Sequence, residues 1–278
     1  SKGKHLITSK IEHSTVLKTC QALEKEGYEV TYIDVTERGV IDPEQLKNAI
    51  RNDTVAISVM YVNNETGVVQ PIDEIAKMIE GKGIVLHTDA IQGVGKEMIL
   101  PKKQGIHALS AAAHKFYGPK GTGFLYLDQN YMIEKEITGG SQERNRRSGT
   151  ENVHGIVGMA KALEIVYSDM EEEQAKEKEM QIYLEEALKE EICNIKINCG
   201  NSRRISSVVN ITLEDCNVQT LMVALDMEGI CVSGGSACMS GAMETSHVLK
   251  AMGASEEDLK SSIRVSIGRY NTKDEIDI

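Results

Sequence analysis

The chain has 278 residues, of which 41% are hydrophobic and 26% charged, a composition typical of a globular protein with a sizeable core. Its 31 basic and 42 acidic residues give a formal net charge of −11, which repels phosphate backbones and argues against nucleic-acid binding. No run of about 18 apolar residues is present, so the sequence predicts no membrane-spanning helix and no membrane partner.

Residues 1–160 alternate expected strands with expected helices. The strands are expected at residues 4–8, 28–33, 54–62, 84–87 and 123–127, and the helices at 16–23, 43–50 and 72–79. Asp42 and Pro43 predict an N-cap followed by the first position of the second helix. The strand at 54–62 is almost continuously apolar, as in strands that are buried on both faces. This alternation predicts an α/β fold with a mainly parallel sheet.

The pattern changes after about residue 155. A long helical region is expected as far as residue 192, with inward positions at Ile182, Leu184, Ala187 and Leu188. Beyond it, half-buried strands are expected at 207–213 and 262–267, with helices at 221–225 and 248–252 between them. We therefore expect a large domain at residues 1–170 and a smaller α+β domain at residues 171–278.

Two segments of the first part carry candidate chemistry. Asp89 ends an apolar strand, where open α/β sheets bind ligands, and Gln92 follows in the next turn. Asp89 as a simple helix cap fits the sequence equally well. In the second segment, a run of small residues ends in His114 and Lys115. Small neighbours are expected to leave Lys115 with little water around it, which favours imine formation, whereas a lone lysine in a loop is usually a solvated charge.

Six cysteines are scattered without a C-x-x-C pair, so the sequence predicts no metal site. A chain of this size needs no disulfides, and we expect reduced thiols and a cytoplasmic protein. Cys20 and Cys231 are expected to be buried and to pack as small hydrophobic residues. Cys238 follows glycine and serine residues and precedes an expected helix, which suits a reactive thiolate. Arg264 lies on the non-core face of its strand and suits a carboxylate clamp, although an ordinary surface arginine fits there too.

Taken together, these segments resemble the cysteine desulfurases of the NifS/IscS type, in the class-V aminotransferase group of fold-type-I pyridoxal-phosphate enzymes. The resemblance covers nearly the whole chain. It lies in ordered motifs at Glu12-His13, 62–67 (VNNETG), 87–92 (HTDAIQ), 114–121 (HKFYGPKG), 147–152 (RSGTEN), Ser236-Ala237-Cys238 and Ser262-Ile263-Arg264. It implies a cofactor-binding large domain of fold type I and a small C-terminal domain that carries the cysteine loop.

The resemblance also implies pyridoxal 5′-phosphate as the cofactor. By motif, Lys115 is implied to hold it as a Schiff base, and Asp89 to pair with the pyridine nitrogen. Gln92 is implied to bind the phenolic oxygen, and His13 to stack on the ring and move protons.

The remaining implied roles concern the phosphate, the substrate and the sulfur. His114 and Thr150 are implied to contact the phosphate, Thr150 in the site of a neighbouring subunit. Asn64, near the cofactor, and Arg264 are implied to orient the substrate carboxylate, and the Cys238 thiolate to take the substrate sulfur. The resemblance thus predicts conversion of L-cysteine to L-alanine with a persulfide on Cys238, by a homodimer that serves a sulfur-acceptor protein such as an iron–sulfur scaffold.

Two departures from the family pattern fall on the phosphate site. The Gly-Thr-Glu-type turn of the family lies upstream of the segment that matches Ser1, so we expect a missing N-terminal segment, and Ala112 replaces a usual Ser or Thr. Each lost hydrogen bond to a charged group costs about 1.5–3 kcal/mol, which predicts weaker cofactor retention. Two alternatives stay open: another class-V enzyme, such as a selenocysteine lyase or an aminotransferase, and an impaired relic that acts as a binding partner.

Overall fold

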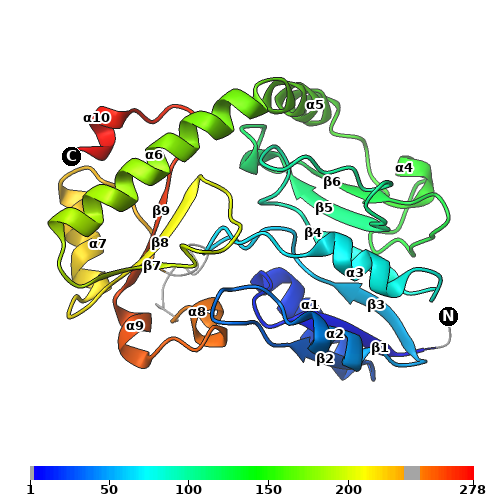
Figure 1. The fold of residues 1–278 in the computed structure, drawn as a ribbon. Coiled ribbons are helices and arrows are strands. Elements are labelled where there is room, and N and C mark those ends of the chain that lie inside the picture. Colours follow the sequence, from blue (N-terminus) through cyan, green and yellow to red (C-terminus); the bar gives the residue numbers. More distant parts are fainter. Residues whose placement is uncertain (1–2, 235–244) are drawn as a thin grey trace.

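The computed structural model describes residues 3–234 and 245–278 (Figure 1). The strands are β1 (His5–Ser9), β2 (Glu29–Ile33), β3 (Thr54–Ser58), β4 (Val85–Asp89), β5 (Ala108–Ala112), β6 (Gly123–Leu127), β7 (Ile195–Asn198), β8 (Val208–Leu213) and β9 (Ser262–Ser266). The helices are α1 (Ser14–Lys25), α2 (Pro43–Ala49), α3 (Ile72–Ile79), α4 (Gln142–Asn145), α5 (Val153–Ser168), α6 (Met170–Glu191), α7 (Val218–Met227), α8 (His247–Ala251), α9 (Glu256–Lys260) and α10 (Lys273–Ile276), with a 3₁₀ turn η1 at Ala113–Lys115.

The larger sheet has the strand order β2-β1-β3-β4-β5-β6. The first five of these strands run parallel, and β6 runs antiparallel to β5. Ile7, Ile57 and Leu86 are neighbours in register on three adjacent strands and are almost fully buried, so they form one layer of the core. The predicted α/β class with a mainly parallel sheet is confirmed.

The other face of this sheet carries a polar ladder across three strands. The His87 ring bonds Ser58 Oγ at 2.8 Å through Nδ1 and Ser110 Oγ at 3.0 Å through Nε2. Burial lowers the pKa of His87, so the ring is neutral and can accept one bond while it donates the other. β3 ends at Ser58, whereas the sequence predicted a strand to residue 62.

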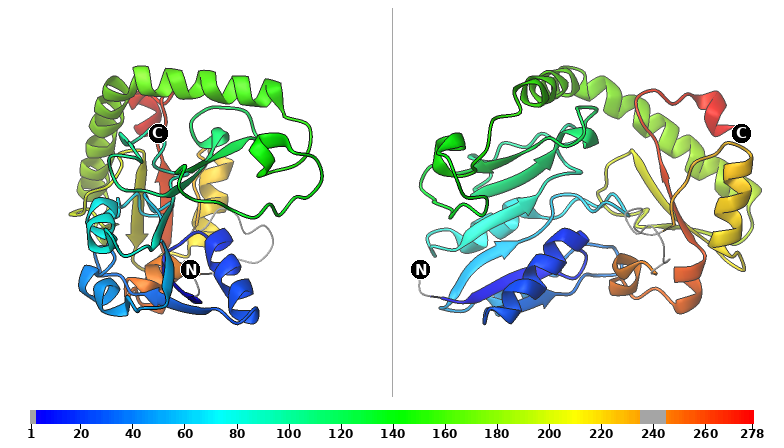
Figure 2. Two further views of the ribbon diagram at one scale, coloured as in Figure 1. Left: turned by 90° about the vertical axis from the view of Figure 1, so that its right-hand side faces the viewer. Right: turned by 180° about the vertical axis from the view of Figure 1, so that it is seen from behind.

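The expected long helical region is two helices, which meet at Asp169. Asp169 is both the C-cap of α5 and the N-cap of α6 (Figure 1). Leu184 and Leu188 of α6 pack on the smaller core as expected, but Ile182 is 43% exposed, so its predicted inward position is wrong. The two views in Figure 2 show α6 running from the larger sheet to the smaller one.

The smaller sheet is antiparallel, with the order β7-β8-β9. Val209 and Ile211 of β8 enter the smaller core, while Asn210 is buried on the opposite face and donates from Nδ2 to the Glu65 backbone oxygen at 3.1 Å. β8 is therefore buried on both faces, and the predicted half-buried strand is wrong because the segment that follows β3 covers its polar face. This packing places the smaller sheet against the segment that follows β3.

Among the described residues, no helix combines the length and the apolar character needed to cross a bilayer. The division into domains at residue 170 stays a prediction.

Candidate functional site

The candidate site lies at the carboxyl edge of the larger sheet. Because β1, β3, β4 and β5 are parallel, the segments that follow them meet at one edge, which is where open α/β sheets bind ligands. Six of the predicted site residues stand at the ends of these strands or in the segments that follow them: His13, Asn64, Asp89, Gln92, His114 and Lys115.

Asp89 is the last residue of β4, and it is 5% exposed. Its Oδ1 accepts from Ile91 N at 3.0 Å, and its backbone oxygen accepts from Tyr61 N at 2.8 Å. A turn rather than a helix follows, so the helix-cap interpretation of Asp89 is wrong. A carboxylate can accept further hydrogen bonds. Because this one is shielded from water, a cationic partner would stabilise its charge.

Lys115 and His114 belong to η1 and are both exposed. The prediction that small neighbouring residues leave Lys115 with little water around it is therefore wrong. The small residues instead allow a close turn. A Cβ on Gly118 would stand 2.9 Å from the Ala113 Cβ, which leaves no room for a larger pair. Phe116, 2% exposed, anchors the segment in the larger core and holds Lys115 at the surface beside it.

His13 is the N-cap of α1 and uses the Nδ1 edge of its ring for this role. Its Nδ1 bonds Thr15 Oγ1 at 2.8 Å and lies 3.3 Å from Thr15 N. This pair of contacts fixes the ring orientation at the start of the helix.

The preceding residue, Glu12, was not assigned a role from the sequence, yet it is fully buried. Ser9 Oγ and Met60 N donate to its Oε1. Burial raises the pKa of Glu12 to about 8, and the nearby Asp89 carboxylate adds to the rise against the two hydrogen bonds. The motif Glu12-His13 after a strand was the available signal, but it did not show that the carboxyl is enclosed.

Arg264 and Asn64 are far apart in the sequence but are brought together by the fold. Arg264 Nη1 donates to the Asn64 backbone oxygen at 2.9 Å. The backbone of Arg264 also exchanges two hydrogen bonds with Ser233, at 2.6 and 3.1 Å. Ser233 begins the approach to Cys238, which itself lies outside the described residues.

Thr150 is exposed in the loop between α4 and α5, and the structure does not place it with the strand-end residues. Among the other thiols, Cys20 is buried as expected, but Cys231 is exposed, so its predicted burial is wrong. The described residues contain no cluster of His, Cys, Asp and Glu suited to a metal ion.

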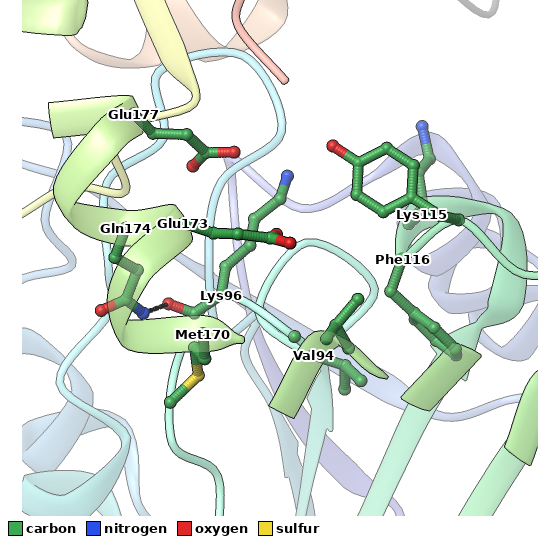
Figure 3. Close-up of a pocket in the computed structure, with 11 residues that line it drawn as sticks. Val94, Lys96, Lys115, Phe116, Met170, Glu173, Gln174 and Glu177 are labelled. Carbon is green, nitrogen blue, oxygen red and sulfur yellow. Dashed lines mark hydrogen bonds between the residues drawn. The ribbon is translucent and has the colours of Figure 1, made fainter. Parts of the chain in front are cut away.

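A small pocket lies beside Lys115 (Figure 3). It is formed by the turn after β4, the segment from Lys115 to Tyr117, and the first turns of α6. Lys96 enters it from the turn after β4 and was missed from the sequence, because nothing around a lysine in a glycine-rich turn signals that its side chain is half-buried in a pocket.

Comparisons with known proteins identify the family of the chain. The chain matches the family described as Aminotransferase class-V over residues 1–278. It is 43% identical over 276 residues to a cysteine desulfurase IscS of Dictyoglomus turgidum, a match that covers 99% of this chain and 70% of that protein.

Two solved structures also match nearly the whole chain. The fold superposes on a protein described as NifS-like with a TM-score of 0.92 at 33% identity, covering 99% of this chain and 72% of that one. It superposes on a structure described as SspA in complex with cysteine with a TM-score of 0.84 at 35% identity, covering 98% and 76%. The chain therefore belongs to the class-V aminotransferase family and, within it, to the group of NifS- and IscS-like cysteine desulfurases.

Proposed function

We propose that this protein is a pyridoxal-phosphate-dependent cysteine desulfurase, which converts L-cysteine to L-alanine and takes the sulfur on Cys238. The observation that carries the proposal is the buried carboxylate of Asp89 at the strand edge that also presents Lys115, in a chain of this family.

The residues at the strand edge fit pyridoxal phosphate. Asp89 offers a water-poor carboxylate to a protonated ring nitrogen, and Lys115 offers an accessible amine to the aldehyde. His13, held by Thr15, is proposed to lie over the ring, and His114 and Thr150 to hold the phosphate. When bound, this cofactor supplies an electron sink that eases loss of the substrate α-proton.

Arg264 is proposed to bind the substrate carboxylate, with Asn64 beside it. The bond from Nη1 to the Asn64 backbone oxygen fixes the plane of the guanidinium, and a fixed planar guanidinium recognises a carboxylate through two parallel hydrogen bonds. Since Ser233 is hydrogen-bonded to the backbone of Arg264, the segment leading to Cys238 starts beside the proposed substrate site. Both features support delivery of the substrate sulfur to Cys238.

The finer assignments belong to the same proposal. We propose that the protein acts in the cytoplasm as a homodimer and passes sulfur to an acceptor protein such as an iron–sulfur scaffold. The dimer is supported by three apolar side chains on one face of α5: Val153, Ile156 and Val157 are 64%, 38% and 62% exposed. We also propose the division into a cofactor-binding domain at 1–170 and a small domain at 171–278.

The test is replacement of Cys238. With L-cysteine and a thiol reductant, we expect the loaded enzyme to release sulfide and L-alanine. Cys238→Ala should lose sulfide release by about 100-fold or more, because it removes the thiol that is proposed to accept the sulfur. Cys193→Ala is the matched control, since Cys193 is an exposed thiol after α6, and it should keep full activity.

Two outcomes would favour the alternatives. Undiminished sulfide release by Cys238→Ala would contradict the desulfurase mechanism and favour another class-V reaction. A lysine-bound pyridoxal absorbs at about 420 nm. A preparation without this absorbance, even after cofactor is added, would favour the alternative that the protein is an impaired relic.

A further inference from the structure

We propose that Lys96 is a positioning residue, which fixes the side-chain amide of Gln92 so that its NH₂ group faces the cofactor oxygen assigned to Gln92. The inference rests on the proposed function. It follows from one contact: Lys96 Nζ lies 3.4 Å from Gln92 Oε1, within the turn that follows β4.

The chemistry of that contact decides the orientation of the amide. The oxygen and nitrogen of a glutamine amide have similar shapes, and the partner determines which atom faces it. A lysine ammonium only donates hydrogen bonds, so the Gln92 atom that faces Lys96 must be the oxygen. The NH₂ group is then directed away from Lys96 and offers a donor to an acceptor such as a phenolate oxygen.

Lys96 is itself held by α6. Gln174 Nε2 donates to the Lys96 backbone oxygen at 2.6 Å, and the carboxylate of Glu177 attracts the ammonium group (Figure 3). Glu177 is only 7% exposed, so its charge is poorly screened by water. Two residues of α6 thus fix the lysine that orients Gln92.

The other charged groups around the Lys96 amine either repel it or are paired elsewhere. Lys115 from η1 and Arg264 from β9 repel the ammonium, while Glu173 of α6 is engaged in an ion pair with Arg269. Burial lowers the pKa of Lys96 to about 8, and Glu177 counteracts the fall, so the amine is largely protonated at neutral pH. Protonation is the state in which Lys96 can only donate.

A double-mutant cycle on the full chain tests the inference. The variants are Lys96→Met, which keeps the stem but removes the donor, Gln92→Ala, and the two combined. Lys82→Met is the matched control, an exposed lysine before β4 at the opposite end of that strand. The readouts are the dissociation constant of pyridoxal phosphate and the pH midpoint of the visible absorption band of the loaded protein.

We expect Lys96→Met to weaken cofactor binding about three- to tenfold, the net size of a typical hydrogen bond, and to shift the absorption midpoint in the direction that Gln92→Ala shifts it. In the Gln92→Ala background, Lys96→Met should not weaken cofactor binding further, although the lost charge beside Lys115 still shifts the absorption midpoint. Lys82→Met should change nothing. If the effects of Lys96→Met and Gln92→Ala on cofactor binding simply add, Lys96 does not act through Gln92 and the inference is wrong.

A second variant keeps the test decisive if Lys96→Met does not fold. Glu177→Gln leaves the lysine in place but removes the charge that holds it, so we expect a smaller loss of cofactor binding, again absent when Gln92 is alanine. An additive effect of Glu177→Gln would overturn the inference. Failure of the proposed function looks different: the unmodified protein itself would then not bind pyridoxal phosphate at all.

Discussion

Glu12 is a carboxylic acid enclosed by protein at the point where β1 ends. Its Oε1 accepts two hydrogen bonds, and its Oε2 has no hydrogen-bond partner among the described residues. Because an ionised carboxylate in this position loses its hydration and faces Asp89, the folded state prefers the protonated acid up to about pH 8. The unfolded chain, by contrast, ionises near the ordinary value of 4.5.

The consequence is a fall in the free energy of unfolding as pH rises. Between pH 4.5 and about 8 the unfolded state has released the Glu12 proton and the folded state has not, so stability decreases by up to about 1.4 kcal/mol per pH unit. Above pH 8 both states are ionised and the decrease stops. Glu12→Gln mimics the protonated acid, so we expect this variant to lose that part of the pH dependence and to be more stable than the unmodified protein at pH 8.

Urea unfolding at pH 5, 6.5 and 8 measures this difference. Glu80→Gln, at an exposed carboxylate after α3, is the control and should leave the pH dependence unchanged. Parallel pH curves for Glu12→Gln and the unmodified protein would show that Glu12 is ionised in the folded state.

At the residue scale, the candidate site residues that could be identified from the sequence are those whose position in a strand determines where the side chain points. Asp89 at the end of β4 and Arg264 on β9 were identified in this way, and Asn64 by its motif. Glu12 and Lys96 were not, because their importance comes from contacts with distant segments. Met60 N donates to the Glu12 carboxyl group, and Gln174 of α6 donates to the Lys96 backbone oxygen. No local pattern records such contacts.

Among the elements, α6 is held by an ion pair that hardly reaches water. Arg204, in the segment before β8, pairs with Glu185 of α6, and the two side chains are 4% and 13% exposed. Arg204 also donates from Nη1 to the Val208 backbone oxygen at 3.3 Å. We expect Glu185→Gln to destabilise the protein by about 3 kcal/mol, because it leaves a buried guanidinium without its counter-charge.

Chemical denaturation of this variant has a matched control within the chain. Lys161 and Glu164 form an ion pair on the surface of α5, with side chains 63% and 68% exposed, so Glu164→Gln should cost less than about 0.5 kcal/mol. Equal losses in the two variants would contradict a special role for the buried pair.

The elements that the sequence predicted well are those with strong local signals. Asp42 accepts from Glu44 N and Gln45 N as the N-cap of α2, and Pro43 takes the first helical position. β6 has the predicted bounds, Gly123–Leu127. β5 was not predicted, because alanine and serine are poor strand formers and only pairing with β4 and β6 makes the segment a strand.

At the scale of the whole molecule, the exposed face of α5 predicts how two copies meet. Val153, Ile156 and Val157 recur at the spacing that places side chains on one face of a helix, and such a face is normally covered. A carboxylate introduced at the centre of this face would lose its hydration when two copies associate, which disfavours association. We therefore expect Val157→Glu to convert the proposed dimer into a monomer in sedimentation experiments at micromolar concentration.

Met227→Glu is the control for an apolar residue that is simply exposed. Met227 ends α7, is 82% exposed and lies in the part of the chain that packs on the smaller sheet, so its replacement should leave the dimer intact. If Thr150, just before α5, reaches the phosphate in the other subunit, the Val157→Glu monomer should also release pyridoxal phosphate faster than the unmodified protein. A monomeric Val157→Glu protein that retains its cofactor normally would support the α5 face as the dimer interface. The same result would contradict the proposal that Thr150 contacts the phosphate in the other subunit.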